Sequence, residues 1–348
     1  MRPQEARLPF SRALPLLAAG CLLWLAACDV PPEPSPPEPP PAPEPAPEPP
    51  PAPEPPPAPP PEPSEESQAL SQYYRRVQAD LLEQGLLRGD GGGADAPVTD
   101  TMLARDFVEI ALFNEYATGQ IGDPRGESRL NRWEGPIRME VEFGASVPEG
   151  QRVRDRAQVG AYAARLSSLT GVPIAPVEEG GNFHVLVLSE DDREGFAPSL
   201  RDLVPGISES SVRTFVNLPK STMCLVIAFA GGEDGSYGQA VVLIRAEHPE
   251  LLRTMCIHEE LAQGMGLPND SLTARPSIFS DTDEFGRLTP HDELLLRMLY
   301  DPRLRVGMTA EEARPVVREI ATELVEGTGG TGGTGNTGGA GGTGGGQS

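Results

Sequence analysis

The residues with the clearest chemical potential lie in one short segment, 257–270. In a helix, Glu259 and Gln263 lie one turn apart and share a face, and Glu260 follows Glu259 about 100° round the axis. A Gly-Met-Gly turn after this helix should return Asn269 towards the same face. A carboxylate in such a cluster can act as a general base, while its neighbours hold a water molecule or a hard cation.

The segment resembles the signature of the metzincin branch of the zinc metalloproteases, which is a helix with HExxH, a glycine turn and a third histidine. In the register that aligns best, Glu259, Gln263 and Asn269 take the three histidine positions. Glu260 takes the position of the general base, and Gly266 that of the turn glycine.

A bacterial family of secreted or lipoprotein domains of unknown function is a closer resemblance. Its members carry a Glu-Glu-x-x-Gln core with Asn-Asp after the glycine turn, as this chain does. The resemblance covers roughly residues 133–300. It implies a zincin-like (metzincin-like) α+β domain with a mixed sheet, a motif helix and flanking helices, and it implies no established activity.

The donor types argue against a catalytic zinc ion. Imidazole and thiolate suit zinc, whereas Gln263 and Asn269 offer neutral amide oxygens, so only Glu259 remains as a good ligand. We therefore expect no cofactor, with zinc or calcium as the alternative.

Two functions follow from this expectation. The first is a non-catalytic module that binds a peptide or an envelope protein in the cleft, with strand 240–244 as the pairing edge. The alternative is an atypical metal-dependent hydrolase or peptidase in which Glu260 is the base and Glu259, Gln263 and Asn269 hold the metal.

Three histidines are weaker candidates. His258 is expected to play a structural part, facing the core or stacking near the cleft. His184 falls on the polar side of its strand and is expected to be exposed. His291 lies at the start of a helix, where capping is expected rather than catalysis.

Hydrophobic periodicity predicts the elements that must position these residues. Alternating or continuous apolar runs predict strands at 137–143, 183–188, 224–230 and 240–244. Helical spacing predicts helices near 70–82, 102–113, 159–169, 249–264, 292–300 and 310–324. This order indicates an α+β fold.

The N-terminus indicates export. A basic stretch and the short apolar run 14–27 end in Leu-Ala-Ala-Cys, which resembles the bacterial lipobox. The sequence predicts a signal peptide over 1–27, acylation of Cys28, and a lipid-anchored protein of the cell envelope on the periplasmic or outer-surface side. In that oxidising compartment Cys224 and Cys256 are expected to form a disulfide, with two buried thiols as the alternative.

The chain is compositionally extreme at both ends. Residues 28–66 form a Pro/Glu-rich tether expected in polyproline II, and 327–348 form a Gly/Thr-rich tail expected to be disordered. The globular domain is therefore placed at 67–326. A net charge of −23 argues against nucleic acid as a partner and leaves the lipid anchor as the contact with the membrane.

Overall fold

The computed structural model describes residues 61–114, 126–231 and 235–329. The predicted signal peptide, Cys28 and most of the tether and tail lie outside the described residues. Within the described ranges, no helix combines the length and the apolar character that crossing a bilayer requires.

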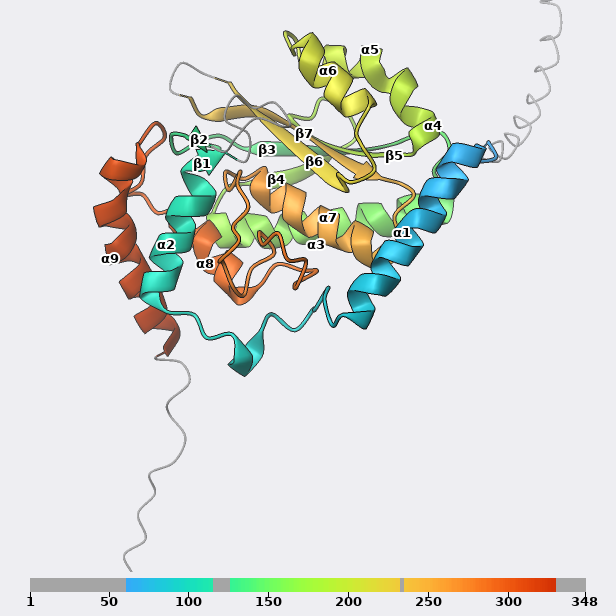
Figure 1. Cartoon of the computed structure of the whole chain (residues 1–348). Coiled ribbons are helices and arrows are strands. Elements are labelled where there is room, and N and C mark those ends of the chain that lie inside the picture. Colours follow the sequence, from blue (N-terminus) through green and yellow to red (C-terminus); the bar gives the residue numbers. More distant parts are fainter. Residues whose placement is uncertain (1–60, 115–125, 232–234, 330–348) are drawn as a thin grey trace, which may run out of the picture. The chain divides into compact units, whose positions relative to one another are not determined.

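The centre of the fold is a five-stranded sheet with the order β4-β3-β5-β7-β6 (Figure 1). Its strands are β3 (Ile137–Phe143), β4 (Ile174–Val177), β5 (Phe183–Leu188), β6 (Cys224–Ala230) and β7 (Tyr237–Arg245). Among these five described strands, only β6 runs antiparallel to its neighbour, and the other pairs are parallel. A separate short pair joins β1 (Phe113–Asn114) to β2 (Gly126–Glu127).

The expected pairing edge was wrong. Residues 240–244 belong to β7, which lies between β5 and β6, so β6 and β4 are the edge strands. The run Ala-Val-Val-Leu-Ile is buried throughout, whereas β6 is half-buried over most of its length. An unbroken apolar run is typical of a strand covered on both faces, and this explains the central place of β7.

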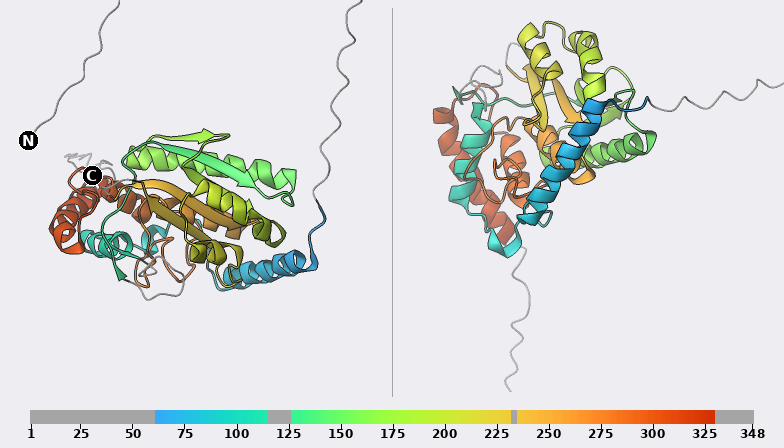
Figure 2. Two further views of the ribbon diagram at one scale, coloured as in Figure 1. Left: turned by 90° about the horizontal axis from the view of Figure 1, so that it is seen from above. Right: turned by 45° about the vertical axis from the view of Figure 1, so that its right-hand side comes forward.

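Helices cover both faces of this sheet (Figures 1 and 2). One face carries α3 (Glu149–Thr170), α7 (Glu250–Gln263) and α8 (Pro290–Leu299), and the other carries α4 (Glu190–Arg193), α5 (Ala197–Leu203) and α6 (Glu209–Val216). At one end α2 (Asp100–Ala111) packs on α9 (Ala310–Gly329). The described residues also form two 3-10 turns, η1 (Gly93–Asp95) and η2 (Glu194–Phe196).

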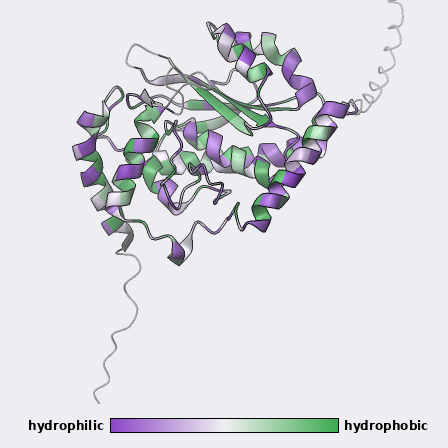
Figure 3. Ribbon diagram, in the orientation of Figure 1, coloured by the Kyte–Doolittle hydropathy of each residue, from purple (hydrophilic) through white to green (hydrophobic). Residues whose placement is uncertain are grey.

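Two hydrophobic clusters share the sheet between them. The larger cluster lies between the sheet and α2, α3, α7, α8 and α9, and the smaller lies under α5 and α6. Figure 3 shows the apolar strands between these layers. Alternate residues of β5 serve the two clusters, as Val185 and Leu186 do, so this strand is buried on both faces.

The N-terminal helix α1 (Glu65–Glu83) closes a polar end of the domain. Tyr74 of this helix is fully buried and donates a hydrogen bond of 2.9 Å to the Lys220 carbonyl. Ser67 donates one of 2.9 Å to Glu247. These contacts attach α1 to the segment that leads into β6 and to the segment that follows β7.

The predicted mixed α+β fold is therefore confirmed, and all four predicted strands and six predicted helices are present. Three of the strands have the predicted ends, whereas β7 and the helices begin or end at other residues. Helix α3 is capped at its C-terminal end by Gly171, which has a φ of 74°. Helix α9 continues to Gly329, past the expected start of the tail at residue 327.

The predicted disulfide is present. Cys224 at the start of β6 is bonded to Cys256 in α7, and their Cα atoms lie 5.8 Å apart. The bond attaches the edge strand to the motif helix, which are the two elements that face each other at the site described below.

Removal of this disulfide should destabilise the domain. It closes a loop over a sequence separation of 32 residues. On loop-closure entropy, Cys224→Ser with Cys256→Ser should lower the free energy of unfolding by about 3–4 kcal/mol. Denaturant unfolding of the double variant and the parent chain measures the difference, and equal midpoints would contradict the prediction.

Candidate functional site

A cavity of about 580 Å³ lies between the edge strand β6 and helix α7. Residues 221–228 form one wall, and Glu259, Glu260 and Gln263 of α7 form the other. Every charged residue that lines it within the described part of the chain is acidic. These residues are Glu259, Glu260, Asp270, Asp281 and Asp283. We call this cavity the acidic pocket.

The structure brings together three of the four residues that the sequence placed in the site. Glu259, Glu260 and Gln263 all line the acidic pocket. Carboxylate oxygens of the two glutamates lie within 4.8 Å of each other and of the Cys224 sulfur. That sulfur is committed to the disulfide and is not available as a thiolate ligand.

Asn269 does not join them. It is 1 % exposed, it does not line the acidic pocket, and its Nδ2 donates to the Glu109 carbonyl at 2.8 Å. Asp270 lies in the pocket instead, where its Oδ1 accepts a hydrogen bond of 2.8 Å from Nε2 of Gln263. The side chains of α7 therefore converge as expected, but after the turn Asp270, and not Asn269, joins them.

The turn itself explains this displacement. Gly266 has a φ of 126°, and a Cβ there would lie 2.3 Å from the Asn131 carbonyl oxygen. Only glycine fits this position, and the chain leaves it in a direction that ties Asn269 to the end of α2. The sequence indicated a turn here but could not indicate the direction in which the chain leaves it.

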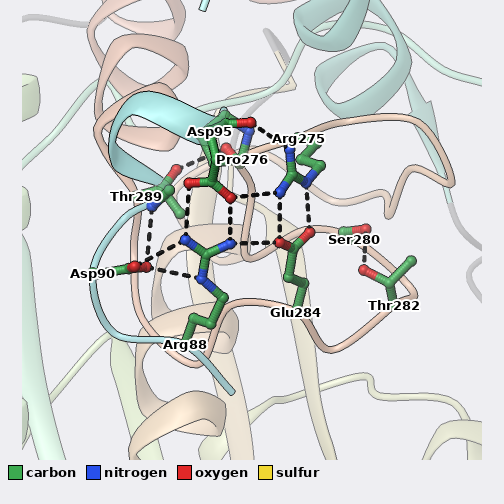
Figure 4. A network of polar contacts seen from close by, with 10 residues as sticks. Arg88, Asp90, Asp95, Arg275, Pro276, Ser280, Thr282, Glu284 and Thr289 are labelled. Carbon is green, nitrogen blue, oxygen red and sulfur yellow. Dashed lines mark hydrogen bonds and ion pairs between the residues drawn. The ribbon is translucent and has the colours of Figure 1, made fainter. Parts of the chain in front are cut away.

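The loop that brings Asp281 and Asp283 to the acidic pocket is held by a network of ion pairs that the sequence did not indicate (Figure 4). Arg88 contacts Asp90 at 2.8 Å, and Asp95 and Glu284 at 2.9 Å. Arg275 contacts Glu284 at 2.7 Å and Asp95 at 3.0 Å. Together they join the segment before α2 to the loop that carries Ser280 and Thr282.

Main-chain bonds complete this junction. The Leu87 amide donates to the Asp283 carbonyl at 2.9 Å, and the Arg88 amide donates to that of Glu284 at 2.7 Å. Burial, and next the charge of Asp281, raise the pKa of Asp283 above its ordinary value. No local pattern in residues 85–95 or 280–284 could indicate the pairing, because it joins segments almost 200 residues apart.

His258 has the structural part that was expected. Its Nδ1 accepts a hydrogen bond from the Leu288 amide at 3.2 Å, and its ring stacks on Tyr162 at 4.1 Å. Burial, and next the charge of Arg287, lower its pKa to about 4. It is not among the residues that line the acidic pocket.

The expectations for the other two histidine candidates were wrong. His184 is 2 % exposed rather than exposed, because α5 covers the polar side of its strand. His291 does not cap α8, which is capped by Thr289 and Asp292 in a capping box. Instead, fully buried His291 lies with Nε2 at 3.2 Å from the Asp106 carboxylate.

These features define a mixed α+β domain with an acidic pocket beside an antiparallel edge strand. A family described as "Protein of unknown function (DUF2927)" matches residues 100–319, and the chain belongs to this family. The match includes every described residue that lines the pocket, whereas α1 and Arg88 lie before it. No curated protein matches this chain.

The buried pair of His291 and Asp106 predicts a pH dependence of stability. Burial by itself lowers the pKa of His291, but the carboxylates of Asp106 and Asp292 outweigh it and raise the pKa to about 9. The charged imidazole therefore stabilises the fold fully below pH 6.5, and this contribution disappears as pH rises through about 9.

Thermal unfolding between pH 6 and 10 measures this effect. The parent chain should lose several degrees of melting temperature above pH 8, and His291→Gln should be less stable at pH 6 with a flatter profile across the range. A variant with the same pH profile as the parent would contradict the assignment.

Proposed function

We propose that this chain is a non-catalytic, zincin-like binding domain that holds an extended peptide along β6 and places a basic side chain of that peptide in the acidic pocket. The observation that carries the proposal is the position of the pocket, which lies beside an edge strand and is lined by five acidic residues. The peptide belongs to a partner in the cell envelope.

The edge strand supplies the main-chain part of this binding. Among the described residues, β6 has a strand neighbour only on the side of β7. An extended peptide can therefore add to the sheet through main-chain hydrogen bonds, while pockets beside the strand select its side chains. Residues 225–228 of β6 line the acidic pocket, so an added strand would lie next to it.

The charge of the pocket supplies the selectivity. Carboxylates approach from α7, from the turn after it and from the loop at 281–283. Glu260 is only 5 % exposed, and a charge at such a depth acts more strongly than one in bulk water. A lysine or arginine side chain has the charge opposite to that of these lining residues, and the net charge of −23 attracts such a peptide at long range.

Two features support a zincin-like relationship. The motif helix carries its polar residues one turn apart, and it lies against a mixed sheet, as the resemblance of segment 257–270 implies. Glutamate, glutamine and aspartate replace imidazoles in the pocket, and such oxygen donors acidify a bound water weakly. This supports a binding function over hydrolysis.

The hydrolase remains the second candidate because of one contact. Glu259, with Gln263 and Asp270, could hold a hard cation such as calcium, and the Glu260 carboxylate, within 4.8 Å of that of Glu259, would act as the base. Calcium-dependent peptide cleavage that Glu260→Gln abolishes would favour this candidate.

We also propose a lipid anchor at Cys28, on the strength of the lipobox-like sequence before it. Acyl chains at this cysteine would hold the chain at a membrane, and the Pro/Glu-rich residues 28–66 would display the domain away from the surface.

Peptide binding tests the main proposal. Labelled nonapeptides of alternating serine and valine, with a central arginine or glutamate, should differ by at least about tenfold in affinity for the purified chain by fluorescence anisotropy. The arginine peptide should bind more tightly, and more so at low salt, because the pocket is acidic. An N-methylated arginine peptide should lose binding, since it cannot donate to β6.

Charge-neutral variants locate the effect. Glu259→Gln and Asp281→Asn should weaken the arginine peptide, whereas Glu149→Gln, an exposed glutamate at the start of α3, should not. Equal affinity for the arginine and glutamate peptides would exclude the acidic pocket as the binding site.

A second prediction tests the zincin-like geometry. Glu259→His with Gln263→His places two imidazoles one turn apart beside the Asp270 carboxylate, which completes a set of three zinc ligands. The double variant should bind one zinc equivalent more than the parent chain in dialysis and elemental analysis. Adding Asn269→His should bring no further gain, because that side chain is directed to the Glu109 carbonyl. A folded double variant without the extra zinc would contradict the geometry.

A further inference from the structure

A second group of side chains of the types that ligate metals lies on the opposite face of the sheet, under α5. Glu140 and Glu142 of β3 and His184 of β5 project there, and Glu140 is directly paired with His184 across the two strands. Gln239 of the next strand, β7, joins them and donates a hydrogen bond to the Leu203 carbonyl of α5. None of these residues lines the acidic pocket.

The two carboxylates converge on one ring nitrogen. Nδ1 of His184 lies 3.3 Å from Oε1 of Glu142 and 3.8 Å from Oε2 of Glu140. One ligand atom from each of the three residues lies within 4.8 Å of the other two. Ligands held about 2.1 Å from a tetrahedral metal lie about 3.4 Å apart, so modest rotations of the two glutamates would bring all three into range.

We propose that Glu140, Glu142 and His184 form a divalent-metal site. One imidazole nitrogen and two carboxylate oxygens suit zinc or a similar first-row cation, with the fourth position open to water. The negative charge of two adjacent glutamates would be neutralised by the ion, which would link β3 to β5. The site is separate from the acidic pocket, and the proposal does not depend on peptide binding there.

The surroundings restrict this site without closing it. The side chain of His184 is 3 % exposed, that of Glu140 is 14 % and that of Glu142 is 29 %, so a cation can enter past Glu142. The Gly181 amide donates to Oε2 of Glu140 at 2.8 Å and orients this carboxylate. The ligand set is therefore partly fixed before the metal binds.

The contacts of the His184 ring fit the tautomer that carries its proton at Nδ1. Nδ1 then donates to the Glu142 carboxylate, and Nε2 lies 3.3 Å from the amide nitrogen of Gln239 as an acceptor. When a metal binds at Nδ1, the proton must move to Nε2 through exchange with water. A half-turn of the Gln239 amide, which gives up its bond to Leu203, would then present an oxygen to Nε2–H.

Zinc titration of the full chain tests the site. Isothermal titration should show one tight equivalent, and Glu142→Gln should weaken it at least about tenfold because a charged ligand is replaced by a neutral amide. Glu179→Gln, an exposed glutamate in the loop before β5, is the matched control and should bind as the parent does. Glu259→Gln with Glu260→Gln should also retain the equivalent, which distinguishes this site from the acidic pocket.

Nitrogen NMR of the histidine rings gives a readout that loose binding at surface carboxylates would not change. Zinc should shift the His184 resonances from the Nδ1–H tautomer to the Nε2–H tautomer. The proposal is overturned if no saturable equivalent is found, if Glu142→Gln binds zinc as tightly as Glu179→Gln, or if the His184 tautomer does not change.

Discussion

The attachment of β6 to α7 through Cys224 and Cys256 is the constraint on which the rest of the site depends. An edge strand has a hydrogen-bonded neighbour on one side only, so its position is less restricted than that of a central strand. The disulfide holds its first residue against the helix that carries Glu259, Glu260 and Gln263. The distance between these two elements sets the width of the acidic pocket, and both of its walls include residues next to the disulfide.

Two of the acidic residues of the pocket are positioned by contacts with a segment that is distant in the sequence. Asp281 and Asp283 lie on a loop whose place is determined by residues 87–95, through main-chain bonds and the arginine network. Exposed ion pairs contribute little to stability one at a time, but here two arginines contact three carboxylates, share two of them and fix an orientation. The segment before the family match therefore completes a pocket whose lining lies inside that match.

The two faces of the sheet carry different polar chemistry. Beside α7 the acidic residues line an open pocket, which suits a cationic ligand. Under α5 the glutamates of β3 meet a buried histidine, which suits a metal ion. Both arrangements use carboxylates in a strongly acidic chain, yet only the second includes an imidazole. This difference is the physical reason for assigning a peptide to one and a metal to the other.

The sequence by itself determined the elements and the chemistry of the motif helix. Apolar periodicity depends only on neighbours along the chain, so it identified β3, β5, β6, β7 and α7, and helical spacing placed Glu259, Glu260 and Gln263 together. The short β4, which contains a proline, and the short helices α4–α6 gave no comparable pattern. Tertiary structure alone decided that β6 is the edge, that Asp270 replaces Asn269, and that His184 is buried. Each of these depends on strand order, on the exit angle of a glycine turn or on a covering helix, and contacts between distant segments set all three.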